Sequence, residues 1–159
     1  MSHRQNSLNC FEEIMKIYTI GFTKKSARRF FDLLKENRVE CLVDIRLHPH
    51  GQLSGCTKKD DLSYFLKELI ACDYRHMPNL APTDDILKTY REDKDWGKYE
   101  RAFEALMDQR NIPEVLDRTL FEDNNCCFMC SQDIPKKCHR RLVSERLALE
   151  WNNVEIIHL

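Results

Sequence analysis

Short apolar segments alternate with longer amphipathic segments along most of the chain, and this alternation limits the fold more than any other feature. Residues 16–20 are rich in β-branched and aromatic side chains, which is typical of a β-strand. In residues 27–34 the apolar side chains recur at the spacing of one helix face, with Thr23 as a candidate N-cap. The same patterns predict strands over residues 40–45, 74–76, 126–130 and 154–157, and helices over residues 62–69, 83–90, 95–106 and 138–151 and in a segment with Pro113 in its first turn.

Strands that alternate with helices are joined by right-handed crossovers, which place helices on both faces of the sheet. We therefore expect an α/β fold with three layers, in which a mostly parallel sheet is flanked by helices. The chain shows no internal repeat and no linker. Residues 1–15 are predicted to form a loose N-terminal extension, and residues 16–159 a single α/β domain. Trp96, Tyr99 and Phe103 share one helix face and are predicted to pack in its core rather than stack on a ligand.

The composition excludes several classes of protein. The net charge is −1, whereas a general nucleic-acid binder carries a basic excess, so any recognition of an anion must be local. No apolar run approaches the roughly 20 residues that span a bilayer, so we expect no membrane association. The eight cysteines include the adjacent pair Cys126 and Cys127, and no secretory signal precedes them. We therefore expect a cytoplasmic protein with reduced thiols.

The side chains best suited to chemistry follow the predicted strands. Ligands of open parallel sheets bind outside the carboxyl ends of the strands, so these side chains are expected to converge on one edge. The candidates are Lys24, Asp44, Arg46, Tyr74, His76, Cys130, Cys138, His139, Arg140 and Arg141.

Positive side chains cluster where two helices are predicted to begin, although the helix dipole is already positive at that end. A bound anion reverses this unfavourable interaction. Arg46, Arg140, Arg141, Lys24 and Tyr74 are the candidate anion-binding residues, and Arg is favoured over Lys because its planar fork matches phosphate. The alternative for the lysines is that they extend into water.

A thiol at a helix N-terminus beside His and Arg has a lowered pKa, so Cys138 is the first candidate nucleophile and Cys130 the second. His139 or His76 would move protons. Asp44 either acts as a general base or forms a structural ion pair with Arg46. Cys127 and Cys130 match C-x-x-C, but residues three apart in a strand face opposite ways, so this pair is not predicted to form a redox or zinc site.

Several short motifs occur together in this chain. They are Thr19-Ile20-Gly21, Asp44-Ile45-Arg46 with Pro49, Tyr74-x-His76-x-Pro78-x-Leu80, Leu80-Ala81-Pro82, Asp95-Trp96-x-x-Tyr99 and Cys130-x7-Cys138-His139-Arg140. Over roughly residues 16–159 the combination resembles the domain-of-unknown-function 488 family. The resemblance implies an α/β domain with clustered motifs and no settled activity. This chain has Phe22 where relatives often have His, and Gln132 where they often have a carboxylate, which weakens a metal or acid–base role for those positions.

Three functions remain open from the sequence. The first is an enzyme, without a bound cofactor, that acts on a phosphate-bearing small molecule, a nucleotide or a nucleic-acid end. The second is a non-catalytic module that binds a nucleotide or nucleic acid at the same site. The third is a metal-binding protein that uses Cys130, Cys138 and His139, with His76 or Asp44 as a further ligand. The oligomeric state is left open.

Overall fold

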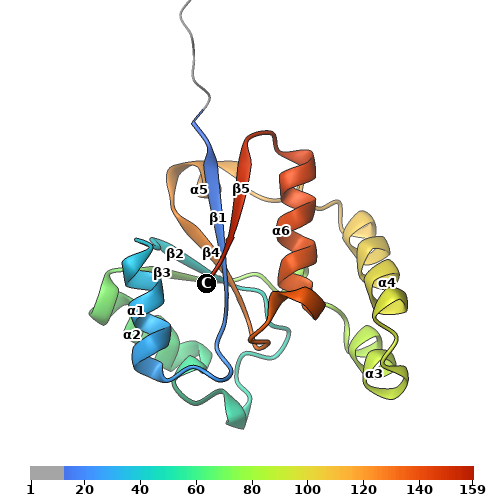
Figure 1. The fold of residues 1–159 in the computed structure, drawn as a ribbon, viewed down its shortest axis with the longest axis horizontal. Coiled ribbons are helices and arrows are strands. Elements are labelled where there is room, and N and C mark those ends of the chain that lie inside the picture. Colours follow the sequence, from blue (N-terminus) through green and yellow to red (C-terminus); the bar gives the residue numbers. More distant parts are fainter. Residues whose placement is uncertain (1–12) are drawn as a thin grey trace, which may run out of the picture.

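Five parallel strands form one sheet within residues 13–159, the part of the chain that the computed structural model describes, and their order is β3-β2-β4-β1-β5 (Figure 1). The predicted extension over residues 1–15 lies mostly outside the described residues. The parallel sheet with helices on both faces confirms the predicted α/β fold. The strands are β1 Met15–Gly21, β2 Cys41–Asp44, β3 Asp73–His76, β4 Cys126–Cys130 and β5 Val154–His158.

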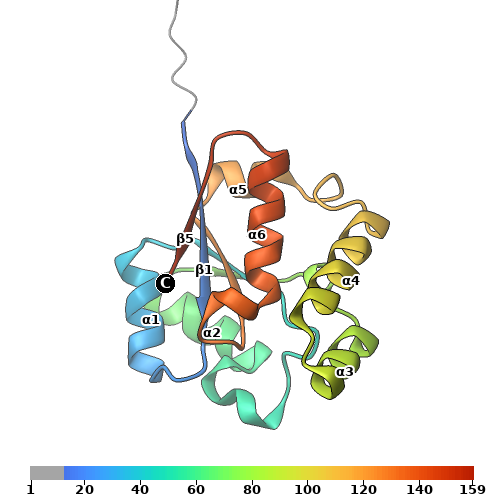
Figure 2. The ribbon, with the colours of Figure 1, turned by 45° about the vertical axis from the view of Figure 1, so that its right-hand side comes forward.

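The helices cover the two faces of the sheet unequally, with α1 and α2 on one side and α4, α5 and α6 on the other (Figures 1 and 2). Helix α3 packs on α4. None of the helices in residues 13–159 is long and apolar enough to cross a membrane. Their bounds are α1 Ala27–Glu36, α2 Lys59–Ile70, α3 Asp84–Asp93, α4 Trp96–Gln109, α5 Arg118–Asp123 and α6 His139–Glu150, and short 3-10 turns span Gln52–Thr57, Pro78–Leu80 and Pro135–Lys137.

The buried apolar side chains form two cores, one on each face of the sheet. Along β4, Cys127 and Met129 pack with α1 and α2, whereas Cys126, Phe128 and Cys130 pack with α4, α5 and α6. This alternation follows from the period of two in a strand. It confirms that Cys127 and Cys130 face opposite sides of the sheet.

Two predicted details of the helices are wrong. The N-cap of α1 is Ser26, whose side chain accepts a hydrogen bond from the Arg29 amide, while the Thr23 hydroxyl donates to the carbonyl of Ser131 instead. No helix begins at Pro113, because residues 110–115 form turns. The next helix starts only where the Asp117 side chain accepts from the Thr119 amide and caps α5.

The order of the strands creates a crevice at the carboxyl end of β4. The chain leaves β1 and β2 into α1 and α2 on one face, but leaves β4 into α6 on the other face. Because β4 lies between β2 and β1, the loops diverge on either side of it. Ligands of doubly wound sheets bind at such a reversal.

Gly21 ends β1 where the loop after β4 passes directly against it. A Cβ atom at this position would overlap the carbonyl group of Gln132 and lie 3.1 Å from Nη1 of Arg140. The backbone of Gln132 is fixed by neighbouring bonds, since the Phe22 and Thr23 amides donate to the carbonyls of Cys130 and Ser131. Glycine is therefore required here by close approach.

Replacing Gly21 with alanine is expected to destabilise the fold by about 3 kcal/mol, because the loop after β4 must move. Gly97→Ala is the matched control. Its Cβ would meet only the flexible end of Arg101, at 3.3 Å, and the Asp95 carboxylate at 3.5 Å, and alanine is favoured in a helix. Urea unfolding of both variants measures the difference. Equal stabilities would show that the loop gives way without cost.

Candidate functional site

A cleft of about 410 Å³ opens at the carboxyl ends of β2 and β4 and at the start of α6. A larger hollow of about 760 Å³ lies at the amino ends of the strands, but neither cysteine nor histidine lines it within the described residues. The cleft is lined by Arg46, Leu47, His48, Pro82, Leu87, Tyr90, Arg91, Lys94, Trp96, Tyr99, Cys130, Ser131, Gln132, Lys137, Cys138 and His139.

Two cysteine sulfurs meet at the floor of this cleft. Cys130 is the last residue of β4 and Cys138 is the N-cap of α6, and their Sγ atoms lie 2.7 Å apart as free thiols. Their exposed fractions are 1% and 2%. The structure thus brings together the two sulfurs that the sequence named as candidates, although both are nearly buried.

Arg140 is fully buried beneath the two sulfurs. Its Nη1 donates to Cys130 Sγ at 3.1 Å, to Cys138 Sγ at 3.5 Å and to the carbonyl of Gln132. Its Nη2 donates to the carbonyl of Asp133 at 2.8 Å, and its Nε to Thr19 Oγ1 at 3.3 Å. Among the residues that the structure describes, no carboxylate accepts a hydrogen bond from this guanidinium. A cysteine thiolate is therefore the anion closest to its charge.

The two thiols differ in pKa. Burial raises the pKa of Cys130, but the hydrogen bond from Cys138 and the charges of His139 and Arg140 outweigh burial and lower it to about 6. Burial, followed by the hydrogen bond to Cys130, raises the pKa of Cys138 well above its usual value. The prediction that Cys138 has the lowered pKa is wrong. The Arg140 side chain lies closer to Cys130 and overrides the helix N-terminus that was expected to activate Cys138.

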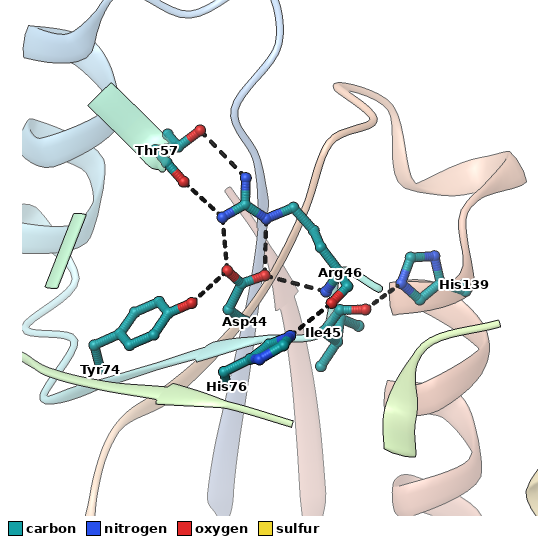
Figure 3. A network of polar contacts seen from close by, with 7 residues as sticks. All are labelled: Asp44, Ile45, Arg46, Thr57, Tyr74, His76 and His139. Carbon is teal, nitrogen blue, oxygen red and sulfur yellow. Dashed lines mark hydrogen bonds and ion pairs between the residues drawn. The ribbon is translucent and has the colours of Figure 1, made fainter. Parts of the chain in front are cut away.

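Asp44 and Arg46 form a buried ion pair rather than part of the reactive centre (Figure 3). The Asp44 carboxylate accepts from Arg46 Nε at 2.8 Å and Nη2 at 2.6 Å, from the Arg46 amide, and from the Tyr74 hydroxyl at 2.7 Å. Arg46 also donates to Thr57 and lies over the ring of Phe22 at 5.2 Å. Phe22 thus packs on the Arg46 guanidinium.

This network leaves little free capacity for catalysis. Asp44 is fully buried and its carboxylate accepts four hydrogen bonds. Of the two roles expected for Asp44, the geometry therefore favours the structural ion pair with Arg46 over the general base. Burial and the bonded Asp44 carboxylate raise the pKa of Tyr74, which keeps its hydroxyl protonated as a donor.

Two candidate histidines are fixed by backbone carbonyls (Figure 3). His76 Nε2 donates to the carbonyl of Arg46 at 2.8 Å, and His139 Nε2 donates to that of Ile45 at 2.9 Å. His139 lines the cleft, whereas His76 and Tyr74 line a separate hollow of about 520 Å³. His139 is therefore the histidine placed to act beside the thiols.

Two predicted anion contacts lie elsewhere. Arg141 pairs with Glu100 at 2.9 Å and Glu145 at 2.7 Å, so two carboxylates already balance its charge. Lys24 lines a different hollow of about 340 Å³ between the start of α1 and residues 55–57. The expected convergence of all these positive groups on one rim is wrong for Lys24 and Arg141.

The sequence analysis missed two of the three exposed cations of the cleft. Arg91, Lys94 and Lys137 are exposed at its edge, and none of them forms an ion pair within the described part of the chain. The lining contains no Asp or Glu. Lys137 stood in the basic run before Cys138, but nothing in the sequence placed the end of α3 beside the cysteines.

The structure does not assemble the proposed metal ligands. Within residues 13–159, no group of three or more His, Cys, Asp or Glu side chains is arranged to hold a metal ion. Asp44 is bonded to Arg46 and Tyr74, and His76 lies in the separate hollow, so neither joins the cysteine pair.

Comparison with known families gives one match. The family model described as "Domain of unknown function DUF488" matches residues 26–147, which is more than half of the chain. No curated protein and no solved structure matches the chain significantly.

The rate of Cys130 alkylation by iodoacetamide is expected to rise with pH to a half-maximum near pH 6, because the thiolate is the reacting form. In Arg140→Gln the midpoint should move up toward that of an ordinary thiol, near 8.5. Arg141→Gln is the matched control and should leave the midpoint unchanged. Peptide mass spectrometry measures both profiles, and a wild-type midpoint near 8.5 would contradict the ion pair.

The same pair should make stability depend on pH. Because the folded pKa of Cys130 lies below the unfolded value, near 8.5, its ionisation stabilises the fold above that value. This contribution is lost as the pH falls through about 6. The stability difference between wild type and Cys130→Ser should therefore shrink from pH 8.5 to pH 6.

Proposed function

The chain belongs to the DUF488 family, and we propose that it is a thiol-dependent enzyme that acts on a phosphate-bearing small molecule in the cleft above Cys130 and Cys138. One observation carries the proposal. Three cations without ion-pair partners among the described residues and a cysteine pair with a buried guanidinium share one cleft that no carboxylate lines.

The electrostatics of the cleft support an anionic ligand. The chain has 25 Lys and Arg against 26 Asp and Glu, yet Arg91, Lys94 and Lys137 gather at this cleft without a lining acid. The amino end of α6 opens into it as well, and the N-cap Cys138 makes no capping hydrogen bond through its side chain. Free amides at a helix N-terminus attract anions, and with the cations they fit a phosphate group.

The size of the cleft supports a small ligand. Its volume of about 410 Å³ lies in the range of small-molecule sites. Trp96 stacks on Tyr99 with ring centroids 4.8 Å apart, and the Arg141 guanidinium lies 5.9 Å from the Trp96 ring centroid, so much of the indole surface is already in contact. The phosphate group, rather than stacking of a base, is therefore the main recognition element.

The reaction class is nucleophilic substitution. The Cys130 sulfur forms a bond to an electrophilic carbon or phosphorus centre of the ligand while the bond to the leaving group breaks. His139 is held through Nε2 by the Ile45 carbonyl, so in its imidazolium form it carries a second proton on Nδ1, which it gives to the leaving group. Arg140 holds the sulfur in its ionised form.

The rate of labelling of Cys130 divided by that of the half-buried Cys56 measures the preference of a reagent for the cleft. This ratio is expected to be higher for the phosphate-bearing alkylating reagent bromoacetol phosphate than for neutral iodoacetamide. Inorganic phosphate should slow the labelling by competition. In Lys137→Ala the preference should fall about threefold, because one surface charge contributes up to about 1 kcal/mol. Peptide mass spectrometry gives each rate.

Lys35→Ala is the matched control, since Lys35 is an exposed lysine on α1, away from the cleft. An equal loss in both lysine variants, or no competition by phosphate, would exclude the phosphate subsite. Calorimetry with inorganic phosphate separates an enzyme from a binding module. Cys130→Ser should keep the affinity and lose the labelling, whereas phosphate binding to a wild type without preferential labelling would indicate a binding module.

A further inference from the structure

Cys130 and Cys138 differ from the other described thiols because their sulfurs are in contact and face a shared cleft. The separation is 2.7 Å, and both side chains line the hollow at the carboxyl end of β4. Two thiols in such contact need only a small movement to reach the bond length of a disulfide, about 2.05 Å.

The two sulfurs are also chemically unequal. Arg140 Nη1 lies 3.1 Å from Cys130 and 3.5 Å from Cys138, so the negative charge rests on Cys130 and the proton on Cys138. A thiolate attacks an oxidant, and a neighbouring thiol condenses with the sulfenic acid that results. The pair therefore has an attacking sulfur and a resolving sulfur in place.

We propose that Cys130 and Cys138 form a dithiol–disulfide couple that reduces a small hydroperoxide, with Cys130 attacking the peroxide and Cys138 resolving the product. This activity uses the thiolate of the proposed enzyme but not its phosphate subsite. It can therefore stand or fall independently of that function.

The Cys130 thiolate attacks the outer oxygen of ROOH, an S–O bond forms, the O–O bond breaks, and the leaving RO⁻ takes a proton from water. The hydroxide that remains is neutralised by the proton that Cys130 released when it ionised. Cys138 then attacks the Cys130 sulfur, and the S–OH oxygen leaves as water with the thiol proton of Cys138. Two thiols and ROOH give a disulfide, ROH and water, so the sulfurs lose two electrons and the peroxide gains them.

Cys41 and Cys126 provide a matched pair of buried thiols that are also hydrogen-bonded and unequal, with a lowered pKa for Cys41 and a raised pKa for Cys126, but that do not line the cleft. They face each other in register across β2 and β4, and each affects the pKa of the other through a hydrogen bond. They lie at the amino ends of the strands and do not line the cleft. The guanidinium that acts on Cys41 belongs to Arg75, which is exposed.

The test treats the reduced full chain with one equivalent of hydrogen peroxide, blocks the remaining thiols and maps tryptic peptides. A disulfide between Cys130 and Cys138 joins the peptide of residues 119–136 to that of residues 138–140. We expect this joined species, a loss of two titratable thiols, and its return to the dithiol with an added thiol reductant. The double variant Cys41→Ser with Cys126→Ser should behave like wild type.

The single variants assign the roles. In Cys138→Ser the oxidation should stop at the sulfenic acid of Cys130, which dimedone traps. Cys130→Ser should consume peroxide about tenfold more slowly than wild type, or slower still. If circular dichroism shows that Cys138→Ser does not fold, the dimedone measurement is repeated with Cys138→Ala. Oxidation of Cys130 no faster than that of Cys56, or a joined peptide that survives Cys130→Ser, would overturn the couple. Labelling by bromoacetol phosphate in the same samples shows whether the phosphate subsite persists when the redox activity fails.

Discussion

The structure depends on a buried guanidinium that has a cysteine sulfur in place of a carboxylate. Arg140 is fully buried and stays protonated, and an unpaired buried charge costs several kcal/mol. Ionising an ordinary thiol of pKa near 8.5 at pH 7 costs only about 2 kcal/mol, at 1.36 kcal/mol per unit. Ionisation is the smaller cost, so Cys130 becomes the counter-ion of Arg140. The reactive group therefore follows from a requirement of the folded state.

The elements around this pair serve to hold Arg140 in place. Gly21 at the end of β1 leaves room for the loop after β4, whose Gln132 and Asp133 carbonyls accept from the guanidinium. The Asp133 carboxylate is tied to Lys25 at 2.6 Å, which links this loop to the start of α1. Thr19 Oγ1 accepts a hydrogen bond from Arg140 Nε and is also hydrogen-bonded to Nδ1 of His158 on β5, at 2.6 Å. The Thr-Ile-Gly and Cys-His-Arg motifs thus describe one structural unit.

Local patterns predicted the elements well, because strand period and helix spacing are set by neighbouring residues. All five strands were located, and Cys130 and Cys138 lie together at the carboxyl end of β4 as expected. The prediction assigned the lowered pKa to Cys138 instead of Cys130, because the two pKa values depend on where the Arg140 side chain lies among distant elements. Arg91 and Lys94 were missed for a similar reason, since they reach the cleft only through the packing of α3 on α4. Asp44 could be assigned no single role from sequence, because its bonds to Arg46 and Tyr74 form only in the folded sheet.

The division of positive charge is what would let the proposed enzyme hold a thiolate and also bind an anion. Three arginines have partners within the fold that balance their charges. Arg46 pairs with Asp44, Arg140 with Cys130, and Arg141 with Glu100 and Glu145. Arg91, Lys94 and Lys137 remain at the edge of the cleft without an ion-pair partner in the described residues. A ligand anion gains from the edge cations without displacing the buried pairs. In the proposed enzyme, recognition of the ligand and ionisation of the sulfur therefore depend on different cations, so each can be altered while the other is kept.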